Sequence, residues 1–182
     1  MLPKAESVTS TGEPDGFVTP RCWRRDVQGD GSTRLVVSVP AEELEAMHLR
    51  LIGALGEHLG VLYVQLTDRK RGQLPSPVRR IAVEVPAARV VAALQARREL
   101  IWGDGRHQLW IRGKFRDQVV LDELGMLYCY PDDPAFRDLL AELPQRTDLT
   151  IDTRDYVKVQ FLPEADAQEE SLLDELSLRP WG

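Results

Sequence analysis

An apolar run that ends in proline and leads straight into a helical pattern is the feature that most restricts how this chain can fold. LVVSVP (35–40) is followed by AEELEAMHLRLIGALGEHLG (41–60), and IAVEVP (81–86) is followed by AARVVAALQARRELI (87–101). Proline suits the entry to a helix and interrupts the hydrogen bonding of a sheet. Each of these prolines therefore predicts a change from strand to helix.

The spacing of apolar residues supports a helix in each unit and a strand after it. In the first unit, Leu44, Met47 and Leu51 recur at intervals of three and four, as residues on one face of a helix do. Short apolar runs then predict strands at 61–66 and 107–112. Both units therefore have the order strand, proline, helix, strand.

A third stretch has the same order. It consists of GMLYCYP (125–131) as a strand, DDPAFRDLLAEL (132–143) as a helix and YVKVQF (156–161) as a returning strand. In the helix, Asp133 is a suitable N-cap and Pro134 suits the first helical position.

The three prolines are almost evenly spaced. Pro40, Pro86 and Pro131 lie 86 − 40 = 46 and 131 − 86 = 45 positions apart. Such a period is typical of an internal repeat, but the side chains of the three copies differ, and recurrence of a common supersecondary unit explains the spacing equally well.

The first two units together have the order β-α-β-β-α-β, which is the order of a ferredoxin-like core. We therefore expect an α+β fold with two layers: a mostly antiparallel sheet, with helices on one face, and a third strand-helix-strand unit. The units span about 34–67, 81–112 and 118–162, within a domain at 21–162. Residues 1–20 predict a flexible lead-in, and 163–182 an acidic amphipathic tail.

Composition limits the classes of function. Hydrophobic residues make up 43% and charged residues 29%, which is typical of a globular protein, and the net charge of −6 disfavours non-specific binding of nucleic acid. The two cysteines lack metal-ligand spacing, so we expect no metal site. No nucleotide-binding motif is present, so we expect no cofactor. The absence of a membrane-length apolar run and of a secretion signal indicates a cytoplasmic protein.

Two groups of residues keep an enzymatic hypothesis open. Asp104 and His107 follow one another closely after a helix, and Cys129 precedes Asp132 and Asp133. Neither group supplies the nucleophile, base and orienting group that nucleophilic catalysis requires. A buried cysteine and a helix cap explain the second group without any catalysis.

A basic segment joins the first two units. The positive charge of the stretch 68–80 suggests a docking loop, and its candidate residues are Arg69, Lys70, Arg71, Arg79 and Arg80. Such a loop suits an acidic partner or a nucleic-acid backbone, and a solvated surface loop is the simpler alternative.

The C-terminal tail has the opposite charge. It is acidic, and if helical it presents Leu172, Leu173 and Leu176 on one side. A short amphipathic helix is marginal alone and needs a groove to fold against. We expect it to contact a partner, another copy of the chain or the basic loop.

The third candidate surface is the face of the sheet without helices. If apolar residues point inward, its outward residues include Tyr63, Trp110, Arg112, Tyr128 and Tyr130. Tyrosine, tryptophan and arginine are the residue types enriched at binding hot spots. Cover by another part of the chain or by a dimer mate is the alternative, because large exposed aromatic patches are uncommon on monomers.

Together these patterns favour a non-enzymatic intracellular interaction protein, such as an adaptor, an inhibitor or an immunity-type binder. Its partner would be another protein, with a homo-oligomer as an alternative. An enzyme without a recognisable motif is the second hypothesis. A nucleic-acid-binding module that uses the basic loop and the aromatic face is the third, and the acidic net charge disfavours it.

Overall fold

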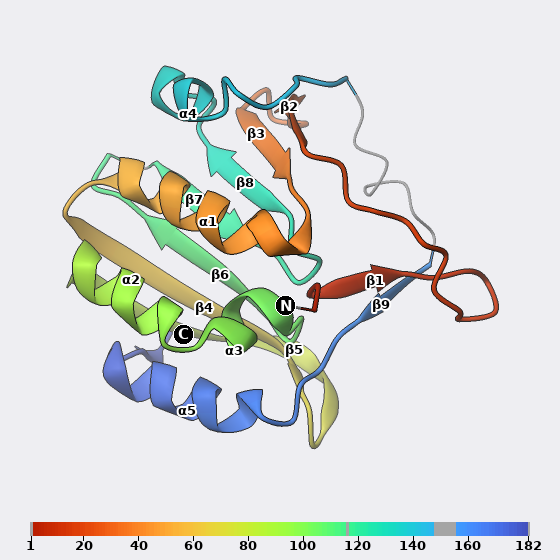
Figure 1. Ribbon diagram of the computed structural model, residues 1–182. Helices are drawn as coiled ribbons and strands as arrows, with labels where there is room; N and C mark the ends of the chain where they lie inside the picture. Colours follow the sequence, from red (N-terminus) through yellow and green to blue (C-terminus); the bar gives the residue numbers. More distant parts are fainter. Residues whose placement is uncertain (1, 116, 148–155, 182) are drawn as a thin grey trace.

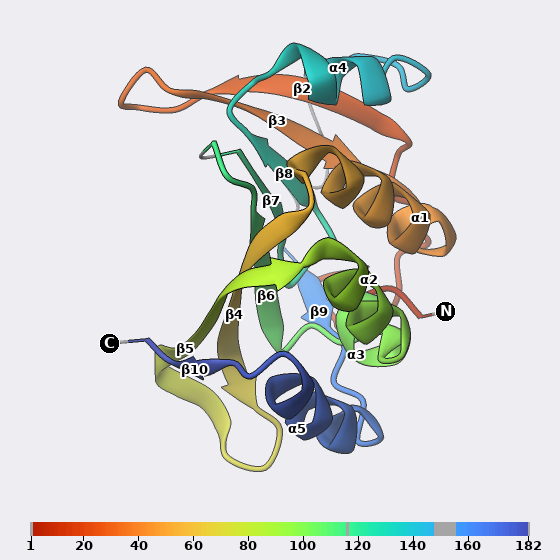
Figure 2. The same cartoon turned by 90° about the vertical axis from the view of Figure 1, so that its left-hand side faces the viewer.

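The computed structural model describes residues 2–115, 117–147 and 156–181, and it has two layers (Figure 1). One layer is a strongly twisted, antiparallel sheet, and the other is formed by helices that cover one of its faces (Figure 2). The prediction of a two-layer α+β fold with a mostly antiparallel sheet is confirmed.

The large sheet has eight strands in the order β10-β5-β4-β6-β7-β8-β3-β2. Their bounds are β2 Cys22–Val27, β3 Thr33–Ser38, β4 His58–Asp68, β5 Gly72–Pro86, β6 His107–Arg112, β7 Gln118–Leu121, β8 Leu127–Tyr130 and β10 Arg179–Pro180. Strand β6 has the bounds that the sequence predicts, whereas β5 is much longer, because the basic segment forms a hairpin with β4 instead of a loop. Pro75 and Pro77 fit there because β5 lies near the sheet edge.

The helices are α1 Ala41–Ile52, the 3₁₀ turn η1 Gly53–Leu55, α2 Ala87–Gln95, α3 Arg98–Gly103, α4 Pro134–Leu139 and α5 Ala165–Glu175. The first is shorter than predicted, because the chain turns at Gly56 with φ 101° before β4 begins. The second predicted helix is divided between α2 and α3. At α4, Asp133 accepts a hydrogen bond from the backbone N–H of Ala135 at 2.8 Å, which confirms the predicted cap.

The spatial order of the strands differs from a ferredoxin-like core. Strands β5 and β6 are parallel to each other with β4 between them, so the second unit is a split β-α-β unit. Strand β3, however, pairs with β8 and is separated from β6 by β7 and β8. The ferredoxin-like prediction therefore fails for the first unit, because β4 occupies the position between β5 and β6 that its first strand, β3, would hold in such a core.

The N-terminal segment is held by the fold. Strand β1 (Ala5–Ser7) pairs with β9 (Val157–Val159) in a separate two-stranded sheet, so the returning strand of the third unit does not extend the large sheet. The ammonium group of Lys4 is buried and donates hydrogen bonds to the carbonyl oxygens of Ile101 and Asp104, at 3.1 and 2.7 Å. Residues 4–7 of the predicted lead-in thus have defined contacts with the rest of the chain.

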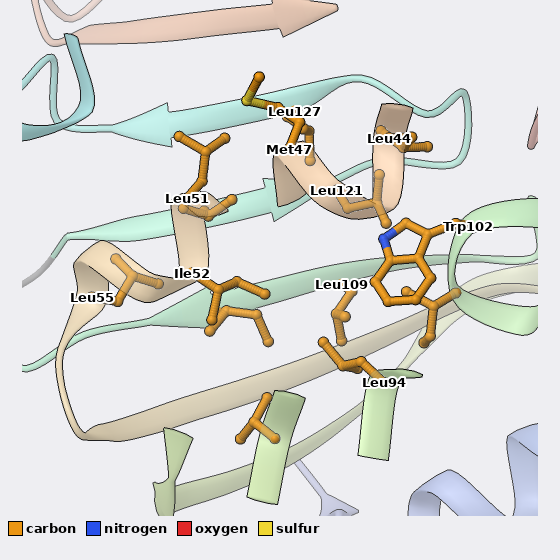
Figure 3. Packing of buried hydrophobic residues seen from close by; sticks show 14 of the residues in the cluster. Leu44, Met47, Leu51, Ile52, Leu55, Leu94, Trp102, Leu109, Leu121 and Leu127 are labelled. Atoms are coloured by element: carbon orange, nitrogen blue, oxygen red, sulfur yellow. The ribbon is translucent and has the colours of Figure 1, made fainter. Parts of the chain in front are cut away.

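The main core lies between the helices and the sheet. Leu44, Met47 and Leu51 of α1 point toward Leu121 and Leu127 of the sheet (Figure 3). The spacing of α1 in the sequence thus identifies its buried face. Buried side chains of this size each contribute about 1.5–3 kcal/mol to folding, which explains why these short elements are stable.

Candidate functional site

The two faces of strands β4 and β6 have different surroundings. Tyr63 and Leu109 point into the helix-covered core, where both are fully buried. Their neighbours Leu62 and Trp110 are paired across the two strands and point to the opposite face, where both are partly exposed. The prediction of Trp110 as outward is therefore correct, and the prediction of Tyr63 as outward is wrong.

On the inner face, Arg106 is the centre of a buried ionic cluster. Its guanidinium contacts Asp104 at 2.9 Å, Asp166 at 2.8 Å and Glu169 at 3.3 Å. The hydroxyl of Tyr63 donates to Glu169 at 2.5 Å. Burial opposes the charge of Arg106, but the hydrogen bonds to the two aspartates outweigh burial and raise its pKa. The cluster is an ion pair network in which Arg106 contacts all three carboxylates.

The predicted pair of Asp104 and His107 is not formed. The Asp104 carboxylate accepts hydrogen bonds from Arg106 and from the backbone N–H of Leu162. The ring of His107 stacks on Tyr63 at 4.8 Å, and neither of its nitrogens has a partner among the described residues. Burial, followed by the charge of Lys4, lowers the pKa of His107 well below its usual value.

The second enzymatic group is also divided among other contacts. Cys129 is fully buried on the core side of β8, and burial raises the pKa of its thiol well above the usual range. Asp132 pairs with Arg25 and Arg137, both at 2.5 Å. Since Asp133 caps α4, the three residues do not converge on a common site.

The outer face of the sheet has two halves. In the first half, polar side-chain groups are engaged in contacts within the chain. Over β3 and β8, the Arg34 guanidinium lies 4.6 Å from the ring centre of Tyr128 and donates to the hydroxyl of Tyr130 at 2.8 Å. It also pairs with Asp26 at 2.8 Å, and Tyr128 donates to Asp122 at 3.0 Å. Tyr128 and Tyr130 therefore face outward as predicted, but their polar groups are engaged within the chain.

The second half, over β5, β4 and β6, forms a groove of about 600 Å³. Apolar and aromatic side chains dominate its lining, and two arginines and two glutamines complete it. The lining residues are Gly60, Val61, Leu62, Val64, Leu66, Pro77, Arg79, Ile81, Val83, Gln108, Trp110, Arg112, Gln118 and Trp181. We call this surface the outer groove. Three of the predicted binding residues, Arg79, Trp110 and Arg112, meet in it.

A β-bulge shapes the wall of the outer groove. Leu59 pairs with Val85 and Val61 with Ala82, so two residues of β5 lie opposite Gly60. One of the two, Glu84, has φ 55°. The bulge turns Val85 into the core and leaves Val83 outward with 68% of its surface exposed. Simple alternation predicts that 81, 83 and 85 all point inward, and the bulge is the reason that it fails.

The chain end closes one side of the outer groove. Strand β10 pairs with Arg80 and Ile81 at the edge of β5, and the backbone N–H of Trp181 donates to the carbonyl oxygen of Arg79 at 3.0 Å. This places the Trp181 side chain in the lining with 56% of its surface exposed. In Figure 2 the chain end lies on the side of the sheet away from α1, α2 and α3.

The other predicted basic residues do not join the groove. Arg69 pairs with Asp166 of α5 at 2.7 Å, so the basic segment and the acidic tail do attract each other. Lys70 and Arg71 lie exposed at the tip of the hairpin, and Arg80 is half-buried.

The predicted leucine patch of the tail belongs to the core. Leu172 and Leu176 are buried there, and Leu173 packs against the same cluster. The groove that this helix needs is therefore supplied by its own chain, and these leucines are corrected from surface anchors to core residues.

Sequence reasoning missed Leu62, Ile81, Val83 and Trp181. For Leu62 a signal exists, because Val61 and Tyr63 on one side of the strand alternate with apolar residues on the other, which indicates a strand that buries both faces at least in part. The position of Val83 depends on the bulge, and that of Trp181 on a pairing between distant segments.

Comparison with protein-family models, with curated proteins and with solved structures finds no match to this chain. In the part of the chain that the structure describes, no three or more His, Cys, Asp or Glu side chains are grouped so that they could hold a metal ion. None of the described helices has the length and apolar character needed to cross a membrane.

Proposed function

We propose that this chain is a non-enzymatic binding protein, of the adaptor, inhibitor or immunity type, whose outer groove receives a segment of another protein. The observation that carries the proposal is the exposure of Val83, Trp110 and Trp181 in one concave, apolar surface. Contiguous exposed apolar surface on a protein often marks an interaction site, and tryptophan and arginine are enriched among the residues that dominate binding energy.

A contrast within the sheet supports the same proposal. The β3–β8 half also carries aromatic and arginine side chains, but these are engaged by Asp26 and Asp122. Over β5, β4 and β6, the volume of about 600 Å³ lies within the range of pockets that bind ligands.

Site-specific photo-crosslinking in cells of the source organism tests the proposal. A photoreactive phenylalanine analogue at position 83 should give an adduct of defined mass with another protein, because this side chain lies in the groove wall. The same analogue at position 18, where Val18 is 73% exposed outside the groove, is the matched control. Adducts that form equally at both positions, or none at position 83, would overturn the proposed function.

A further inference from the structure

We infer that the partner segment in the outer groove is acidic as well as apolar: an extended stretch with apolar residues at its centre and a carboxylate toward each end. The inference rests on the proposed function and specifies the chemistry of the partner. It follows from the charge of the groove, the separation of its two arginines and the free edge of β5.

The charge of the groove has one sign. Arg79 and Arg112 are the only charged residues among its described lining, and both are exposed. Neither guanidinium has a hydrogen bond or an ion pair within residues 2–115, 117–147 and 156–181, whereas Arg34 and Arg106 each have several. In a chain of net charge −6, two arginines without a carboxylate beside an apolar floor are complementary to an anionic partner.

Strand pairing gives the distance between the two charges. Arg79 lies opposite Val64 on one side of β4, and Arg112 lies opposite Gly60 on the other side. Four residues along β4 at about 3.3 Å each, and two strand spacings of about 4.8 Å, separate the two arginine Cα atoms diagonally by roughly 16 Å. An extended peptide covers this distance in about five residues, and the flexible arginine side chains accept carboxylates about four to six positions apart.

The edge of β5 favours a polypeptide over a small amphiphile. Among the described residues, β10 and Trp181 cover this edge only at Arg79, Arg80 and Ile81. Beyond them, a second hollow of about 510 Å³ runs along 81–86 and shares Ile81 and Val83 with the outer groove. A peptide that leaves the groove past Val83 can therefore form main-chain hydrogen bonds with the free edge, which a lipid or dye cannot.

The acidic tail of the chain itself is the most obvious competing occupant, but none of its acidic residues belongs to the described groove lining, and three of them have partners elsewhere. Asp166 pairs with Arg69 and Arg106, and Glu169 accepts from Tyr63. Glu175 pairs with Arg97 at 2.6 Å on the helix side. The tail thus neutralises other arginines and leaves those of the outer groove to a partner.

Selection from a random dodecapeptide library displayed on phage tests the inference with the full chain as bait. Peptides that also bind the Val83→Glu variant are removed, and the rest are synthesised for fluorescence anisotropy. We expect apolar sequences with Asp or Glu about four to six positions apart. Arg79→Glu with Arg112→Glu should weaken their binding by about tenfold or more, because two attractive contacts become repulsive.

The control variant carries the same change in net charge away from the groove. Lys158→Glu with Arg146→Glu alters two exposed residues outside the groove lining and should leave affinity within about twofold of the wild type at low salt. Peptides that depend on Val83 but carry no excess of acid, or that ignore the Arg79 and Arg112 changes, would overturn the inference and leave the proposed function standing. A library without Val83-dependent binders would also overturn it, and crosslinking at position 83 then decides the proposed function separately.

Sedimentation of the chain alone tests whether a second copy of the chain occupies the outer groove. We expect a mass that does not change between the wild type and Val83→Glu. If the wild type is a dimer and Val83→Glu dissociates it, the groove binds a second copy of the chain, and the acidic-segment inference is overturned.

Discussion

Arginine and aromatic side chains meet on the inner face of the large sheet and in the outer groove, but carboxylates accompany them only in the first of these two places. Inside, Arg106 lies among Asp104, Asp166 and Glu169 and next to Tyr63. Outside, the arginines of the outer groove lie beside Trp110 with no acid in the described lining. The difference teaches that residue type alone does not distinguish the two settings, whereas the pairing of each arginine within the chain does.

The inner cluster should be the place where a single change has the largest effect on stability. Arg106→Met leaves the Asp104 carboxylate buried without its counter-charge, which we expect to lower the free energy of unfolding by about 3–5 kcal/mol. Urea unfolding at pH 7 measures it. Arg106→Met combined with Asp104→Asn removes both charges and should recover at least about 1 kcal/mol. A single variant as stable as the wild type would mean that the cluster contributes nothing to folding.

The second largest effect should come from His107 and depend on pH. Burial holds the pKa of His48 at about 3 and that of His107 well below its usual value, so the unfolded chain binds more protons than the folded chain below about pH 6.5. Stability is therefore lost as the pH falls, by about 2 kcal/mol for each histidine at pH 5. His107→Phe keeps a ring against Tyr63 and should remove one of these two losses.

Urea unfolding at pH 7, 6 and 5 checks this prediction. The advantage of His107→Phe over the wild type should grow by about 2 kcal/mol from pH 7 to pH 5, whereas His58→Gln, at an exposed position, should show no such growth. Burial raises the pKa of Asp122 to about 6 and gives an opposite pH dependence, but this contribution is common to all three proteins and cancels. Parallel pH profiles for wild type and His107→Phe would contradict the prediction.

The half of the outer face over β3 and β8 should show an intermediate effect on stability. Arg34→Ala removes the ion pair with Asp26, the hydrogen bond to Tyr130 and the contact with the Tyr128 ring. We expect a loss of about 1–2 kcal/mol in the free energy of unfolding, since these groups are only partly exposed to water. Arg112→Ala is the matched control in the outer groove and should not shift the urea midpoint. Equal losses for both variants would remove the distinction between the two halves.

The sequence predicted the elements better than their arrangement. Strand β6 has the predicted bounds because the glycines and the alternation of HQLWIR define it locally. The pairing of β3 with β8 joins segments about ninety residues apart, and no local pattern encodes it. The helix leucines of the tail were identified as one face, but whether that face meets a partner or the core depends on the same long-range packing.

The candidate site was predicted where alternation is unambiguous. In HQLWIR the inner positions are Leu109 and Ile111, so Trp110 and Arg112 must point outward. In VLYVQL the set Leu62, Val64 and Leu66 is wholly apolar, whereas Tyr63 alternates with Gln65, and this led to the wrong face for Tyr63. The bulge at Glu84 then reverses the alternation along β5, a change that one positive φ produces and that residue types do not reveal.

The smallest predicted effect is an electrostatic one, and it needs no partner. Trp23 and Trp102 are buried, so Trp110 and Trp181 of the outer groove should account for most quenching of tryptophan fluorescence by solutes. Two arginines without counter-charges should concentrate iodide there and repel caesium. Arg79→Gln with Arg112→Gln should lower the iodide quenching constant by roughly a factor of two, raise that of caesium and leave neutral acrylamide unchanged.

Lys158→Gln with Arg146→Gln, which makes the same change in net charge elsewhere, should alter none of the three quenching constants. An iodide constant that responds equally to both double variants would mean that the groove has no local positive potential of its own, and its arginines would then resemble any other exposed charges of the surface.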